Sequence, residues 1–293
     1  MNARQTVSLV LGSGGARGLA HIGVIRWLEA HGYAIRSIAG SSMGALIGGV
    51  YATGKLDVYT AWVSALERLD VLRLLDLSFA RAGLFKGERI MDVLRELIGD
   101  CRIEALPVSY TAVATDLDTG KEVWLREGRL FDAIRASIAI PLLLVPSRLD
   151  GRRLVDGGVV NPIPIAPTLT DRTDLTIAVN LSGKPDAAAK TEPATPLPAP
   201  PTSYKQRIRA FIENLWTSPP KPEPEDLGFF EIALRAMDTM QETIARLKLA
   251  AYTPDVIIDV PRDVCAFHEF HRAKELIAIG EAKTEQAMTR LLR

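Results

Sequence analysis

Two adjacent serines between glycines, in the stretch GSSMG at residues 40–44, have the form of a catalytic turn. The pattern GxSxG places a serine on a sharp turn from a strand into a helix, where flanking glycines give the backbone room. Ser42 is the central serine, and Gly40, Met43 and Gly44 form the turn around it. A glycine-rich turn with chance serines is the alternative, so the chain must also supply an oxyanion-binding group and a base.

A second glycine-rich turn, GSGGARG at residues 12–18, is the candidate oxyanion-binding group. Consecutive glycines at a helix N-terminus expose backbone N–H groups, as an oxyanion hole for a tetrahedral acyl intermediate requires. The candidate donors are Gly14, Gly15, Ala16 and Arg17, and Arg17 can also hold the loop in place or add positive charge. A dinucleotide-binding loop is disfavoured, because GxGxxG read from Gly12 puts Arg17 where the third glycine belongs.

Two residues are candidates for the base that a serine hydroxyl needs. Asp156 ends a short strand and is followed by Gly157 and Gly158, a turn that can present a carboxylate to the edge of a sheet. Taken alone, Asp156 is also a typical turn former. The other candidate is His271, as the last member of a Ser-Asp-His order. Its stretch FHEFHR is one residue short of the HExxH zinc spacing, so no metal site is expected.

Alternating strands and helices are expected to position these turns. A strand at 7–11 leads into the first glycine turn and a helix, and a strand at 34–40 leads into the serine turn and a helix at 43–54. This alternation predicts an α/β fold with three layers, α/β/α, around a mainly parallel central sheet. Further strands are expected at 108–117, 121–127, 152–156, 175–182 and 255–260, and further helices at 56–79, 87–99, 131–139, 229–250 and 267–292.

Composition narrows the class of partner. Lys+Arg and Asp+Glu each count 35 in 293 residues, and this zero net charge argues against nucleic-acid binding by phosphate neutralisation. Cys101 and Cys265 form no metal or CxxC pattern, as expected in a reducing compartment. The apolar run before the first glycines is too short for a secretory signal, and no run is long enough to span a membrane. We therefore expect a cytoplasmic protein, with peripheral membrane contact left open.

A proline-rich insert divides the expected domain. Ten of the 18 prolines fall at 185–201 and 219–224, and between them YKQRIRAFIENLW at 204–216 has the apolar spacing of an amphipathic helix. The expected organisation is a catalytic core at 1–183, an insert at 184–228, and a C-terminal part at 229–293 that completes the same domain. Helix 204–216 is interpreted as a docked surface helix, a mobile lid or a membrane contact.

The stretches GSGGARG, GSSMG and DGG, in this order and spacing, closely resemble the patatin-like phospholipase family. ATDLDTG at 114–120 and ASIAIP at 136–141 are also similar to bacterial members, so the resemblance runs from Val7 to about Ser182. It implies a lipid acyl hydrolase with Ser42 as nucleophile, Asp156 as base and residues 14–17 as oxyanion hole. No cofactor is implied, and the substrate is an acyl lipid or another ester.

Two other functions remain open from the sequence. A protein with the same fold can be catalytically weak and act as a regulatory or lipid-binding partner through 204–216. A Ser-His-Asp hydrolase that uses His271 is the third hypothesis.

Overall fold

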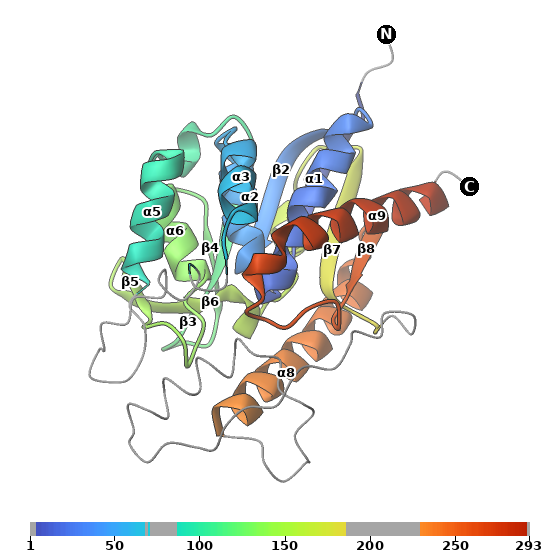
Figure 1. The fold of residues 1–293 in the computed structure, drawn as a ribbon. Coiled ribbons are helices and arrows are strands. Elements are labelled where there is room, and N and C mark those ends of the chain that lie inside the picture. Colours follow the sequence, from blue (N-terminus) through green and yellow to red (C-terminus); the bar gives the residue numbers. More distant parts are fainter. Residues whose placement is uncertain (1–3, 68–69, 71–86, 186–228, 292–293) are drawn as a thin grey trace.

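The fold is seen in a computed structural model that describes residues 4–67, 70, 87–185 and 229–291. Its centre is an eight-stranded sheet with helices packed on both faces (Figure 1). The expected three-layer α/β/α architecture is confirmed.

Four parallel pairings form the main body of the sheet, in the order β3-β2-β1-β7-β8. Antiparallel pairings add β4 and β6 to β3, and β5 to β6. The sheet is therefore mainly parallel, as expected. The strands are β1 Thr6–Leu11, β2 Ala34–Ser41, β3 Ser109–Asp116, β4 Glu122–Leu125, β5 Ser147–Leu149, β6 Arg152–Asp156, β7 Leu175–Gly183 and β8 Val256–Pro261.

Helices follow most of the parallel strands and cover the sheet. They are α1 Ala20–Ala30, α2 Met43–Ala52, α3 Leu56–Ser64, α5 Glu88–Ile98, α6 Leu130–Ser137, α8 Phe229–Tyr252 and α9 Ala273–Leu291. Short 3-10 turns lie at η1 Gly15–Leu19, η2 Ile103–Ala105, η3 Gly157–Val159, η4 Ala166–Thr168 and η5 Phe270–Arg272. In the part of the chain that the structure describes, we find no helix with the length and apolar character needed to cross a bilayer.

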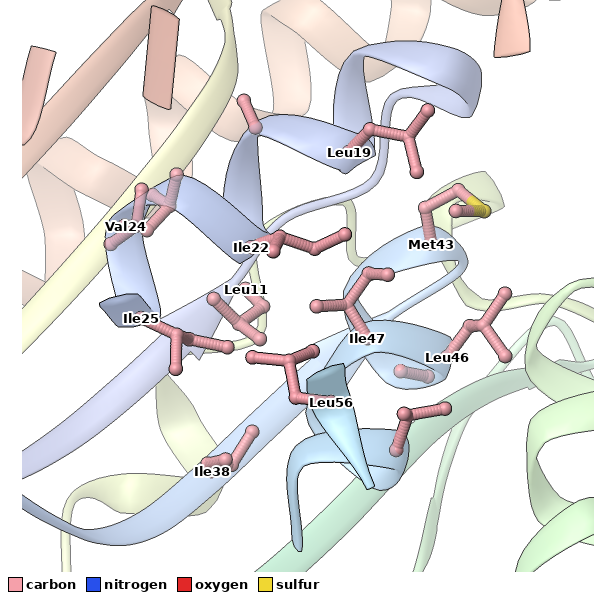
Figure 2. Close-up of a cluster of buried hydrophobic side chains, with 14 of the residues drawn as sticks. Leu11, Leu19, Ile22, Val24, Ile25, Ile38, Met43, Leu46, Ile47 and Leu56 are labelled. Carbon is pink, nitrogen blue, oxygen red and sulfur yellow. The ribbon is translucent and has the colours of Figure 1, made fainter. Parts of the chain in front are cut away.

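The core lies on both faces of the sheet, because side chains alternate along each strand. Leu9 and Leu11 of β1 belong to the large cluster, which also contains residues of α1, α2 and α9. Figure 2 shows part of it, with Leu11 and Met43 packed among the side chains of α1 and α2. Val10, on the opposite face of β1, joins a small cluster with Ala245 of α8. The two turns of the candidate site are thus anchored in the same core.

Two expectations about the elements need correction. Of the helix expected over 56–79, the structure describes a helix that ends at Ser64, where the N–H groups of Ala65 and Leu66 bond to carbonyls three residues back and tighten the last turn. Residues 68–69 and 71–79 of that range lie outside the described part of the chain. The helix expected from 267 begins at Ala273 after the 3-10 turn η5. Helix 204–216 lies outside the described residues and stays a prediction.

Candidate active site

The serine turn joins the buried strand β2 to helix α2. Ser42 stands between them with φ 56° and ψ −123°, a left-handed conformation that a non-glycine residue adopts only when its surroundings enforce it. Ser137, at the end of α6, supplies part of that support. Its hydroxyl accepts a hydrogen bond from the Ser42 N–H at 3.0 Å and donates one to the Val113 carbonyl at 2.6 Å.

Strand pairing explains why Ser42 and Asp156 meet. Ala114 pairs with both β4 and β6, and Val113 pairs with both β4 and β2. Because a strand has two edges, β2 and β6 must share the edge opposite β4. Strand β2 runs parallel to β3 and β6 runs antiparallel to it, so their carboxyl ends point toward each other along that edge. Ser42 follows the end of β2 and Asp156 ends β6.

The two side chains are in direct contact in a buried site. Ser42 Oγ donates a hydrogen bond to Asp156 Oδ2 at 2.5 Å, and each residue is 2% exposed. The Gly158 N–H donates to the other carboxylate oxygen at 2.7 Å. The Asp156 backbone is also fixed, because its N–H bonds to the Ala139 carbonyl and its carbonyl accepts from the Thr115 hydroxyl.

Burial changes the acidity of the carboxyl group. Desolvation raises the pKa of Asp156 to about 7, although the hydrogen bonds from Ser42 and Gly158 act in the opposite direction. A carboxyl group with a pKa near neutrality can take up a proton and return it under physiological conditions.

This pKa predicts the pH dependence of any reaction in which Asp156 acts as a base. Only the ionised carboxylate accepts a proton, so kcat/KM should fall about tenfold per pH unit below pH 7 and level off above it. A pH profile of soluble-ester hydrolysis in wild-type protein checks this. A profile that stays flat from pH 5 to pH 9 contradicts the assignment.

The first glycine loop lies directly beside the serine turn. Strands β1 and β2 are parallel neighbours, and Leu11 at the end of β1 pairs with Gly40. Within the described ranges, the N–H groups of Gly14 and Gly15 have no hydrogen-bond acceptor, whereas the Ala16 N–H bonds to the Phe267 carbonyl at 2.8 Å. Of the expected oxyanion donors, the Ala16 N–H is therefore already engaged in a hydrogen bond, whereas the N–H groups of Gly14 and Gly15 can still donate to an oxyanion.

The side chains of Arg17 and His21 bond to backbone carbonyls of this loop. Arg17 Nε donates to the Gly14 carbonyl at 3.2 Å. This contact corresponds to one of the two roles expected for Arg17, which is to hold the loop in place. His21 Nε2 lies 2.9 Å from the Gly12 carbonyl. Full burial lowers the pKa of His21 to about 4, so the ring is neutral and this nitrogen carries the hydrogen that bonds to Gly12.

Residues 9–169, more than half of the chain, match the family model described as patatin-like phospholipase. The chain belongs to the patatin-like phospholipase family. It is 43% identical to an "Uncharacterized NTE family protein" of Mycobacterium tuberculosis, over 96% of this chain and 91% of that protein. Both matches support the expected family and a lipid ester hydrolase.

More distant relatives of this patatin-like chain are larger proteins. "Lysophospholipase NTE1" of Saccharomyces cerevisiae is 27% identical over 94% of this chain, which spans 16% of the yeast protein. A patatin-like phospholipase domain-containing protein of Caenorhabditis elegans is 38% identical over 55% of this chain and 12% of its own length. The crystal structure of VipD from Legionella pneumophila aligns with a TM-score of 0.44 and 12% identity, over 98% of this chain and 67% of that chain.

The sequence also offered His271 as the base, and the structure bears on that alternative. His271 lies in η5, and the direct 2.5 Å bond between Ser42 and Asp156 leaves no space for an imidazole between them. Among the residues that the structure describes, no three His, Cys, Asp or Glu side chains cluster as a metal site would require.

Sequence reasoning missed the residues that support the site from other elements. Ser137 lies in the stretch ASIAIP, which resembled the family but carried no assigned role. Thr115 had no signal beyond its place near the end of a predicted strand. Gly157 and Gly158 lie where expected, and an added side chain at Gly157 would meet the Val113 carbonyl at 2.0 Å.

Proposed function

We propose that this protein is a carboxylic ester hydrolase that cleaves acyl lipids through a Ser42–Asp156 dyad. The observation that carries the proposal is the buried 2.5 Å hydrogen bond from Ser42 Oγ to a carboxylate whose pKa is raised to about 7. A serine hydroxyl is a weak nucleophile until an adjacent base removes its proton. Asp156 is in hydrogen-bond contact with that proton.

The proposed reaction has two halves. In the first, Ser42 Oγ attacks the ester carbonyl carbon while its proton passes to Asp156, and the N–H groups of Gly14 and Gly15 receive the oxyanion. Collapse of this intermediate breaks the ester bond, and the departing alcohol takes the proton from Asp156. In the second half, water gives a proton to Asp156 and attacks the acyl-enzyme. Ser42 then leaves with the proton, and the free acid is released.

An apolar loop beside the dyad supports an acyl chain as part of the substrate. Ala139, whose carbonyl bonds to the Asp156 N–H, is followed by the apolar residues 140–146. All of these are partly exposed except Leu144, which is 9% exposed. A half-exposed apolar segment directly next to a reacting centre suits the hydrocarbon part of a lipid ester.

Location and membrane contact are further parts of the proposal. Cys101 and Cys265 are free thiols, which fits a reducing cytoplasmic compartment. The amphipathic spacing of 204–216 supports peripheral contact of the protein with lipid surfaces, and a docked surface helix or a lid are the other interpretations of that stretch.

Release of fatty acid from lysophosphatidylcholine and from p-nitrophenyl butyrate tests the proposed function. We expect turnover of both esters by wild-type protein and none above the uncatalysed rate by Ser42→Ala, because the variant has no nucleophile. Equal activity of the two proteins would refute the dyad. If both proteins are inactive but bind phosphatidylcholine vesicles, the regulatory lipid-binding alternative replaces the hydrolase.

A further inference from the structure

Helix α8 packs on the face of the sheet opposite α1 and α9 (Figure 1), and its side chains contact the first glycine loop. Ala245 is the single buried residue among those of α8 whose exposure is described, and Leu249 and Tyr252 of the same helix pack against its cluster. Its contacts with the site are polar. Gln241 Oε1 lies 3.4 Å from the hydroxyl of Ser13, within the first glycine loop.

The shortest of these polar contacts joins Asp238 to Arg17. Arg17 Nη2 donates to Asp238 Oδ1 at 2.7 Å, and the side chains are 5% and 48% exposed. The other guanidinium nitrogens bond to backbone carbonyls, Nε to Gly14 and Nη1 to Arg262, each at 3.2 Å. Asp238 is the acidic partner of this buried charge, and the cost of leaving such a charge unpaired is high.

Peptide geometry connects this ion pair to the oxyanion donors. The Gly14 carbonyl and the Gly15 N–H belong to one planar trans peptide, in which the two groups point in opposite directions. When Arg17 holds the Gly14 carbonyl toward itself, the Gly15 N–H is directed away from Arg17. That N–H is one of the donors with no acceptor in the described part of the loop.

We propose that Asp238 is a positioning residue for the oxyanion hole, acting through Arg17 on the peptide between Gly14 and Gly15. This inference rests on the proposed function and adds to it an acidic residue from the helix that follows the proline-rich insert. Asp238 fixes the direction in which Arg17 extends, Arg17 fixes the Gly14 carbonyl, and the peptide plane then fixes the Gly15 N–H. Asp238 itself does not touch the substrate.

Steady-state kinetics of Asp238→Asn with p-nitrophenyl butyrate give the first test. A misplaced oxyanion donor stabilises the transition state less but does not change substrate binding. We therefore expect kcat to fall roughly 10- to 100-fold with KM nearly unchanged. Asp238→Glu should recover part of the loss because the charge is kept. Asp57→Asn is the matched control, since Asp57 also pairs with an arginine, Arg26 at 2.8 Å, on an exposed surface away from the site.

Hydrogen exchange of the 12–18 peptide gives a second readout that needs no activity. We expect faster exchange in Asp238→Asn than in wild type or Asp57→Asn, since the loop loses its anchor. Unchanged exchange, or an unchanged or higher kcat, would overturn the role of Asp238. If wild-type protein shows no Ser42-dependent hydrolysis, the proposed function fails, and the exchange measurement still decides whether Asp238 positions the loop.

Discussion

Replacing Asp156 by asparagine is expected to lower kcat/KM for ester hydrolysis by roughly 10²- to 10⁴-fold, the usual contribution of a general base. The asparagine oxygen can still accept the hydrogen bond from Ser42 Oγ, which is 2.5 Å from the carboxylate in the wild type. Its amide cannot take up the proton when Ser42 attacks. The variant therefore keeps the contact with Ser42 and loses the base, and its NH2 group also replaces the oxygen that accepts from the Gly158 N–H at 2.7 Å. Hydrolysis of p-nitrophenyl butyrate measures the effect, and activity within threefold of wild type would contradict it.

The same substitution should not destabilise the fold at neutral or alkaline pH. The folded-state pKa of Asp156, about 7, lies well above the value of roughly 3.9 for an unfolded aspartate. The fold thus favours the neutral form, and the stability that this provides is lost as the pH rises through 7. Asparagine stays neutral and avoids this cost, which offsets the lost hydrogen bond from the Gly158 N–H, so we expect the Tm of Asp156→Asn at pH 8 to stay close to that of wild type. A large fall in Tm would mean that the lost activity reflects unfolding.

Replacing Gly44 by alanine is expected to disrupt both the fold and the site. A Cβ at this position would lie 2.0 Å from the Leu11 carbonyl oxygen and 2.5 Å from its carbon, and backbone atoms cannot rotate away. Helix α2 must then move from β1, which shifts Ser42 at the start of the helix. We expect a loss of about 1–3 kcal/mol or more in unfolding free energy, and a fall in kcat of about 10²-fold for a displacement near 1 Å. Denaturant unfolding and ester hydrolysis measure the two effects.

Gly49→Ala is the matched control on the same helix. Its Cβ would meet the ends of the Ile134 and Leu130 side chains at 2.9 and 3.1 Å, and side-chain ends can adjust. Alanine also favours a helix over glycine by about 1 kcal/mol. We expect this variant to be close to wild type in stability and activity. Equal effects of Gly44→Ala and Gly49→Ala would show that contact with the Leu11 backbone is not what limits position 44.

Much of the fold could be predicted because the local patterns were strong. The apolar strand at 7–11 and the strand at 34–40, each followed by a glycine turn and a helix, correspond to β1–α1 and β2–α2. Local patterns do not encode which strands become neighbours. The shared edge of β2 and β6, which brings Ser42 to Asp156, depends on two pairings with β3, between residues about 72 apart for β2 and about 40 apart for β6.

The two residues of the proposed dyad could be named from the sequence, whereas the residues that contact them could not. Ser42 and Asp156 lie on glycine-flanked turns with recognisable spacing. Ser137 and Asp238 contact the site through hydrogen bonds made across the fold, at 3.0 Å to Ser42 and 2.7 Å to Arg17. Serine and aspartate are common on helices, and neither residue has a neighbouring pattern that marks it. Such residues are found from contacts, not from spacing.

Labelling with a fluorophosphonate probe, followed by peptide mass spectrometry, shows whether Ser42 is an activated nucleophile. The probe reacts with an activated serine, so wild-type protein should carry one adduct on the peptide that contains Ser42. Ser42→Ala should carry none, and Asp156→Asn should react far more slowly, because the hydroxyl then has no base. An unlabelled wild-type protein that is shown to be folded, or an adduct that persists in Ser42→Ala, would contradict the account of Ser42 as the nucleophile.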